Sequence, residues 1–179
     1  MRKILLDEKE VESLVTDSLP MIIHGKEGSG ASLYTICLAA KWFTQGNEVL
    51  FLCGYPMAEE EFEREVSSNH EKAKFYTKDN VNEFISAIKS VSDNTIIFVK
   101  NIELFDDNLL SLVEFKHNIV ISGDVENSSF KNKLLTKAFT TEIYFSPLEG
   151  KDLLPTQKYQ GYVISDEYKG ITKLQSDKS

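Results

Sequence analysis

The chain has 179 residues, of which 41% are hydrophobic and 27% charged, and its formal net charge is −8. These values are typical of one soluble globular domain that is long enough to bury a full hydrophobic core. No apolar run approaches the about 18 residues that a membrane span needs, and the apolar segment after the basic N-terminus is too short for a secretory signal. The acidic balance argues against a domain that grips the nucleic-acid backbone.

Hydrophobic periodicity predicts helices over residues 5–15, 31–43, 57–66, 81–91, 108–115 and 131–138. The segment 31–43 is apolar nearly all round, which indicates a helix sandwiched in the core. The segment 57–66 carries a run of glutamates and is expected to be a solvated surface helix. Residues 151–160 form a polar connection. We expect a single domain over residues 1–175 and a disordered tail over 176–179.

Short apolar runs predict strands over residues 21–24, 49–53, 74–76, 95–99, 118–122 and 141–145. Residues 162–164 and 171–174 are expected to pair as a hairpin across a turn that ends at Gly170. Strands that alternate with helices imply a mostly parallel sheet covered on both faces. Ligands of such sheets bind at the carboxyl ends of the strands.

A glycine-rich segment joins the first of these strands to the core helix. It reads Gly25-Lys26-Glu27-Gly28-Ser29-Gly30-Ala31-Ser32. The phosphate-binding loop G-x-x-x-x-G-K-[ST] needs glycines for backbone N–H groups to wrap phosphates, a lysine for the outer phosphates and a hydroxyl for magnesium. Both glycines and Ser32 stand at the required spacing, but Ala31 replaces the lysine. We therefore expect a nucleotide-binding loop of degenerate type.

With this loop and this order of elements, the chain resembles a RecA/KaiC-type P-loop NTPase domain over residues 5–175. RecA-type loops often read G-x-E-S-S-G-K-T, which Gly25, Glu27, Ser29, Gly30 and Ser32 fit or nearly fit. The resemblance implies an α/β fold of three layers, with a mostly parallel sheet, helices on both faces and a closing C-terminal β-hairpin.

Two further positions of that family depart from its pattern here. The Walker B strand, which should end in a magnesium-binding aspartate, is followed by Lys100 and Asn101. The strand that should lead to a water-activating glutamate is followed by Gly54-Tyr55-Pro56. Since phosphoryl transfer depends on positioning and on neutralising phosphate charge, we expect no efficient ATP hydrolysis and no catalytic residues.

Two lysines near the loop have open roles. Lys26 either reaches phosphates, as an early lysine does in some deviant P-loops, or is a solvated loop residue. Lys100 either fills the metal position and touches a phosphate without magnesium, or pairs with a nearby acid. The candidate partners are Glu27, Glu103 and Asp124.

The remaining chemistry-bearing residues have simpler readings. His24 is expected to pack against the sheet, and Cys37 and Cys53 are interpreted as reduced core thiols of a cytoplasmic protein. Asp124 and Glu126 are turn acids that could line the cleft. Residues 127–133 are polar and lightly basic, which leaves open a contact between Phe130 and single-stranded DNA.

Three functions remain open at this stage. The first is a regulatory or assembly subunit without efficient hydrolysis, with a protein partner, a second copy or a RecA-like ATPase beside it. The second is a nucleotide-binding switch or weak ATPase that holds ATP or ADP weakly, with magnesium disfavoured. The third is a DNA-associated accessory protein. No metal site and no membrane contact are expected.

Overall fold

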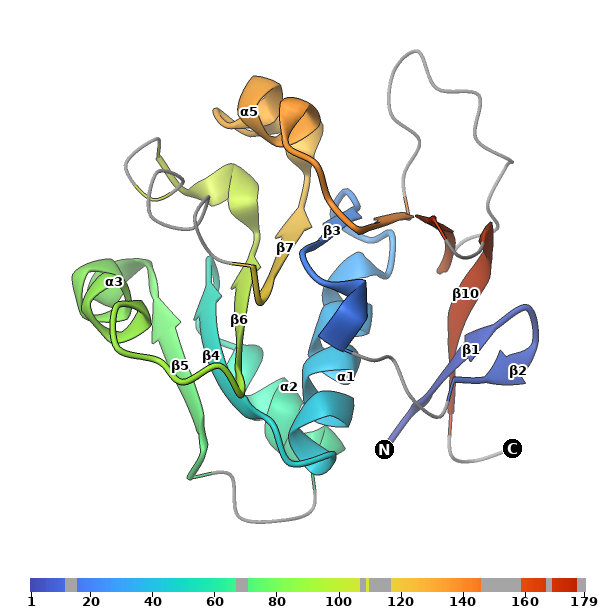
Figure 1. Ribbon diagram of the computed structural model, residues 1–179, viewed down its shortest axis with the longest axis horizontal. Helices are drawn as coiled ribbons and strands as arrows, with labels where there is room; N and C mark the ends of the chain where they lie inside the picture. Colours follow the sequence, from blue (N-terminus) through green and yellow to red (C-terminus); the bar gives the residue numbers. More distant parts are fainter. Residues whose placement is uncertain are drawn as a thin grey trace.

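The computed structural model describes residues 1–11, 16–66, 71–106, 109, 117–145, 159–166 and 169–176. Its described strands form one ten-stranded sheet in the order β2-β1-β10-β9-β8-β3-β7-β6-β4-β5 (Figure 1). The strands are β1 (Lys3–Leu6), β2 (Lys9–Glu10), β3 (Met21–His24), β4 (Glu48–Cys53), β5 (Ala73–Thr77), β6 (Thr95–Lys100), β7 (Ile119–Gly123), β8 (Thr141–Tyr144), β9 (Gln160–Ser165) and β10 (Lys169–Gln175). The helices are α1 (Ala31–Thr44), α2 (Ala58–Glu65), α3 (Val81–Ile88) and α5 (Lys131–Thr136).

The central strands are parallel, and their side chains are buried on both faces because helices cross over both faces of the sheet. β6 is buried at every residue, as is β3, which is the continuous apolar pattern of a strand between two layers. β3 pairs in parallel with β7 and β8, and β4 pairs in parallel with β5 and β6. The expected mostly parallel α/β sheet is confirmed.

Helices cover both faces of this sheet. One core contains Trp42 of α1 and Phe62 of α2 against Phe51 and Phe98 of the sheet. The opposite core places α3 and α5 over the alternate residues of the same strands, with Phe84 among the side chains that are fully buried. The structure therefore has three layers, as the resemblance implied.

The antiparallel part of the sheet closes the fold. β9 and β10 form the expected hairpin, with Ile171 opposite Tyr162, but β10 begins before Gly170, which lies inside the strand. The hydroxyl of Tyr34 in α1 lies 2.9 Å from that of Thr172 in β10, in a buried hydrogen bond. This contact ties the core helix to the hairpin.

The helix expected over residues 5–15 is wrong where the chain is described. Residues of that segment form β1 and β2, and β1 pairs with β10. Asp7 and Glu8 adopt positive φ in the turn, and the Asp7 carboxylate accepts a hydrogen bond of 2.9 Å from Ile171 N–H. The strand wins because its partner comes from the other end of the chain, which local periodicity does not register.

The other predicted elements are confirmed within a few residues of their expected bounds. The helix expected over 108–115 lies outside the described residues except for Leu109, which is helical and buried. The connection expected over 151–160 lies outside them up to residue 158, as does the tail from 177 onward.

A buried ion pair anchors the N-terminus to α2. The backbone N–H of Arg2 donates to Glu65 Oε2 at 2.9 Å, and its guanidinium donates to Oε1. The Glu65 side chain is 4% exposed, whereas that of Arg2 is 43% exposed. Arg2 therefore compensates this buried carboxylate through two hydrogen bonds, one to each of its oxygens.

We predict that Arg2→Ala lowers the free energy of unfolding by about 1.5–3 kcal/mol, because it removes a charge-assisted hydrogen bond from a buried carboxylate. Urea denaturation measures the change. Lys3→Ala is the matched control, since Lys3 and Glu10 pair at 3.6 Å with both side chains more than 40% exposed, and it should cost little. Equal losses in the two variants would contradict the prediction.

Candidate functional site

The glycine loop leaves β3 and enters α1 with the backbone that its sequence demands. Gly28 and Gly30 have φ of 81° and 96°, a region that other residues rarely adopt. A Cβ on Gly25 would lie 2.3 Å from Ala31 Cβ. The Gly25 N–H donates to Gly123 O at 2.9 Å, which joins the start of the loop to the end of β7. The expected strand–loop–helix junction is present.

The N-terminus of α1 faces this loop without a charged neighbour in its own first turn. Its N-cap residue, Gly30, offers no side chain, and no acidic residue stands in the first turn. Ala31 N–H has only a long contact of 3.4 Å to Ser29 Oγ. The helix therefore presents partial positive charge and N–H groups to whatever lies above the loop.

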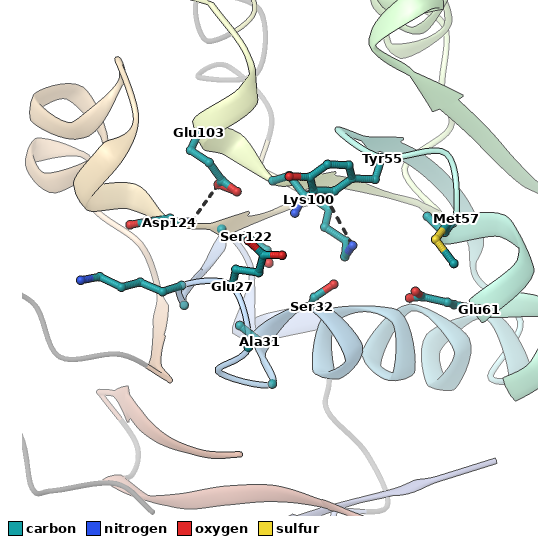
Figure 2. Close-up of a pocket in the computed structure, with 17 residues that line it drawn as sticks. Glu27, Ala31, Ser32, Tyr55, Met57, Glu61, Lys100, Glu103, Ser122 and Asp124 are labelled. Carbon is teal, nitrogen blue, oxygen red and sulfur yellow. Dashed lines mark hydrogen bonds between the residues drawn. The ribbon is translucent and has the colours of Figure 1, made fainter. Parts of the chain in front are cut away.

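A cavity of about 320 Å³ opens above the loop (Figure 2). It is walled by the loop, the ends of β6 and β7, and the segment that leads into α2. The lining residues are Gly25, Lys26, Glu27, Gly28, Gly30, Ala31, Ser32, Tyr55, Met57, Ala58, Glu61, Lys100, Asn101, Glu103, Ser122, Gly123 and Asp124. All the predicted loop residues except Ser29 are among them.

Lys100 is the central side chain of this cavity. The sheet register places it between Cys53 of β4 and Ser122 of β7, at the carboxyl ends of three adjacent strands. Lys100 is only 5% exposed, and Figure 2 shows its ammonium opposite Ser32 across the cavity. Its contacts are to Cys53 Sγ at 3.8 Å and Asn101 Oδ1 at 3.5 Å, both long and both uncharged groups.

Of the two roles open for Lys100, pairing with a nearby acid is not the one that the structure shows. Among the described residues, no carboxylate lies within 4.0 Å of its ammonium. Glu103 instead accepts a 2.9 Å hydrogen bond from the backbone N–H of Asp124, whose carboxylate accepts one of 2.6 Å from Asn127. Glu103 and Asp124 therefore bond to groups of their own loops, and among the described residues neither they nor any other carboxylate pairs with Lys100.

Asn101 supports this arrangement. It has φ of 63°, a left-handed conformation that asparagine tolerates, and its Oδ1 also accepts from Cys53 Sγ at 3.4 Å. Ser122, beside Lys100, accepts a 2.8 Å hydrogen bond from Thr35 of α1. These contacts fix the neighbours of the lysine from both the sheet and the helix.

Sequence reasoning missed several lining residues. Ser122 was placed in a strand without a role, because only the strand order brings it beside Lys100. Tyr55, Met57 and Glu61 come from the segment after β4 and from α2, which bring them to the cavity. A polar or reactive residue at the last position of a buried strand was the available signal.

The remaining candidates fall away from the site. The ring of His24 is 2% exposed and stacks on Tyr144 at 4.4 Å, as expected of a packing residue. Phe130 is fully buried, so its ring is not available for the contact with single-stranded DNA that the sequence left open. Lys131 pairs with Glu126 at 2.7 Å, and Glu126 is not in the cavity wall.

Both cysteines are buried free thiols. Burial raises the pKa of Cys37 to about 12, with a further rise from Glu65. Cys37 therefore stays protonated at neutral pH and acts as a core residue, in agreement with its interpretation.

Comparison with solved structures assigns the architecture. The cytoplasmic domain of the type VII secretion ATPase EccC from Thermomonospora curvata matches with a TM-score of 0.62 and 11% identity, over 100% of this chain and 26% of that one. The flagellar accessory protein FlaH from Methanocaldococcus jannaschii matches with a TM-score of 0.51 and 11% identity, over 80% and 75% of the two chains. The chain has a RecA-like P-loop fold. No family model and no curated protein matches it by sequence.

The P-loop of this fold commonly binds a magnesium nucleotide, and the donor set here does not fit the metal. The strand end that would present a carboxylate presents the Lys100 ammonium instead. No group of three or more potential metal-ligating side chains occurs in the described part of the chain. A divalent cation would meet a buried positive charge beside the P-loop.

We predict that Lys100→Met stabilises the protein without ligand, because it removes a buried ammonium that no carboxylate of the described residues compensates. The expected gain is about 1–3 kcal/mol, measured by thermal unfolding in phosphate-free buffer. Lys133→Met on α5 removes an exposed lysine and should stay within about 0.5 kcal/mol of the parent. A Lys100→Met protein less stable than the parent would show that the ammonium is well compensated in the fold.

Proposed function

We propose that this chain binds the phosphate group of a small ligand at its P-loop without a metal ion, and does so without efficient ATP hydrolysis. The observation that carries the proposal is the buried Lys100 ammonium, which faces the loop and has no carboxylate within ion-pair distance among the described residues. An anion between the loop and Lys100 would supply the missing charge.

The two walls of the cavity supply complementary halves of an anion site. Below lie the glycine loop and the N-terminus of α1, which favour negative charge through N–H groups and the helix dipole. Opposite lies Lys100, whose long contacts leave its ammonium protons available for a stronger acceptor. Ser32 lies between them and offers a hydroxyl.

In this proposal Lys100 replaces both the absent loop lysine and the metal. Two like unit charges about 4 Å apart repel by about 4 kcal/mol at an effective dielectric constant of about 20, and a divalent ion doubles that. Magnesium would therefore weaken rather than support binding beside Lys100. A phosphate at the same distance would instead be attracted to Lys100 by a similar amount, because its charge has the opposite sign.

The same substitutions argue against turnover. Phosphoryl transfer needs charge neutralisation over the transferred group and a positioned nucleophile. Ala31 offers no charge, Lys100 excludes the metal, and Gly54-Tyr55-Pro56 follows the strand that would carry a water-activating glutamate. Glu61 of α2 lines the cavity on the far side of Ser32, so it is the carboxylate whose role as a water-activating base must be tested.

A P-loop protein that binds without hydrolysing acts through occupancy. A ligand present at about 100 times its Kd adds about 2.7 kcal/mol to the stability of the bound state. We therefore assign the chain a regulatory or assembly role, in which a ligand sets the conformation that a protein partner meets. The partner and the compartment stay as sequence-based expectations.

We predict that inorganic phosphate in the presence of EDTA raises the melting temperature of the protein, since binding draws on Lys100 and the loop alone. Lys100→Met should abolish the shift, whereas Lys133→Met should keep it. Differential scanning fluorimetry at constant ionic strength separates specific binding from salt effects. A shift that appears only with magnesium, or that survives in Lys100→Met, would contradict the proposal.

We predict that the purified chain hydrolyses ATP no faster with magnesium than with EDTA, because its cavity presents a cation at the metal position. A coupled assay of phosphate release measures the rate. Glu61→Gln should leave this background unchanged. A magnesium-dependent rate that Ser32→Ala or Glu61→Gln abolishes would establish this chain as an active ATPase and overturn the proposal.

A further inference from the structure

The charges around the cavity bear on which phosphate compound it accepts. We infer that the site takes a single phosphoryl group, as a phosphate monoester, in preference to a diphosphate or triphosphate. This inference rests on the proposed phosphate site and specifies its ligand class. The basis is the arrangement of carboxylates around Lys100.

The cavity wall has more negative than positive side chains. Two lysines, Lys26 and Lys100, stand against four carboxylates, which gives the wall a formal net charge of −2. Lys100 is buried and Lys26 is exposed. The positive potential is therefore local to Lys100 and the helix N-terminus and does not extend along the cavity.

The carboxylates flank this positive spot. In Figure 2, Glu27, Glu103 and Asp124 lie to one side of the line between Lys100 and Ser32, and Glu61 lies to the other. Glu103 is fixed there, because its Oε2 accepts from Asp124 N–H and a Cβ on Gly123 would come within 2.6 Å of that oxygen. A second phosphoryl group that extends to either side of the position between Lys100 and Ser32 would therefore lie near a carboxylate.

Because the residues at the P-loop do not fit a metal ion, the carboxylates around Lys100 determine how many phosphoryl groups the site accepts. A phosphate monoester carries a charge of about −1.5 to −2 at neutral pH. Each added phosphoryl group brings further negative charge, which a magnesium ion would normally share. Here the added negative charge lies near the carboxylates of the cavity wall. Their electrostatic repulsion is only partly screened by solvent and salt.

The outer rim suits the organic part of a monoester. Tyr55 and Met57 are 50% and 54% exposed and line the cavity, and Figure 2 shows Tyr55 on the Lys100 side and Met57 on the Glu61 side. Their apolar surface can contact a ring or an alkyl group that leaves the phosphate towards solvent. The site therefore combines one anion position with an adjacent apolar ledge.

Isothermal titration of the full chain in EDTA at fixed ionic strength tests the inference, with inorganic phosphate, AMP, ADP and ATP as probes. AMP should bind about tenfold or more tightly than ATP, with ADP between them. Glu61→Gln and Glu103→Gln should each narrow this difference by raising the affinity for ATP. Tyr55→Ala should weaken AMP binding and leave inorganic phosphate unchanged.

The outcomes separate the two levels of the argument. Binding of inorganic phosphate together with tighter binding of ATP than of AMP overturns the monoester preference and leaves the phosphate site standing. Equal effects of Glu61→Gln and Glu103→Gln on AMP and ATP also overturn it. No binding of any probe at millimolar concentration overturns the phosphate site itself.

Discussion

The buried ammonium of Lys100 is the feature on which the site depends. It ends a strand whose six residues are all buried, so the sheet itself places the charge in the cavity wall opposite the loop. Its neighbours in register, Cys53 and Ser122, are uncharged. A cation held in that position, with no carboxylate near it among the described residues, raises the free energy of the empty site, and the anion that we propose as ligand would lower it. Stability is thus given up where binding is gained.

The rest of the architecture makes that placement rigid. β6 lies between β4 and β7, and aromatic packing of Phe98 with Phe51 and Trp42 locks the strand under α1. On the same face, the bond from Thr35 to Ser122 joins α1 to the sheet beside the lysine. Because the loop connects β3 to α1, both of its ends are fixed by the same packed elements. The two halves of the proposed anion site therefore come from two packed layers, the sheet that carries Lys100 and the helix α1 that follows the loop.

Sequence patterning predicted most of this framework and little of the chemistry. Local residue spacing predicts the buried parallel strands and the amphipathic α3. The glycines predict the loop, because they permit the positive φ that it requires. The strand β1 escaped because its partner, β10, lies at the other end of the chain. The lack of an acidic partner for Lys100 among the described residues was not predicted for a similar reason. Glu103 and Asp124 are near it in sequence or in the fold, but they bond to neighbouring loop groups instead.

Metal loss and ligand charge are coupled in this site. In a magnesium-dependent P-loop the metal offsets the outer phosphates, so carboxylates can stand close by as metal ligands or bases. With an ammonium in the metal position, the protein must neutralise the ligand with its own fixed charge. In the proposed site, Lys100 and the helix N-terminus would neutralise one phosphoryl group, and the remaining acids would repel any longer phosphate chain. The replacement that disfavours magnesium therefore also disfavours the polyphosphate that magnesium would have accompanied.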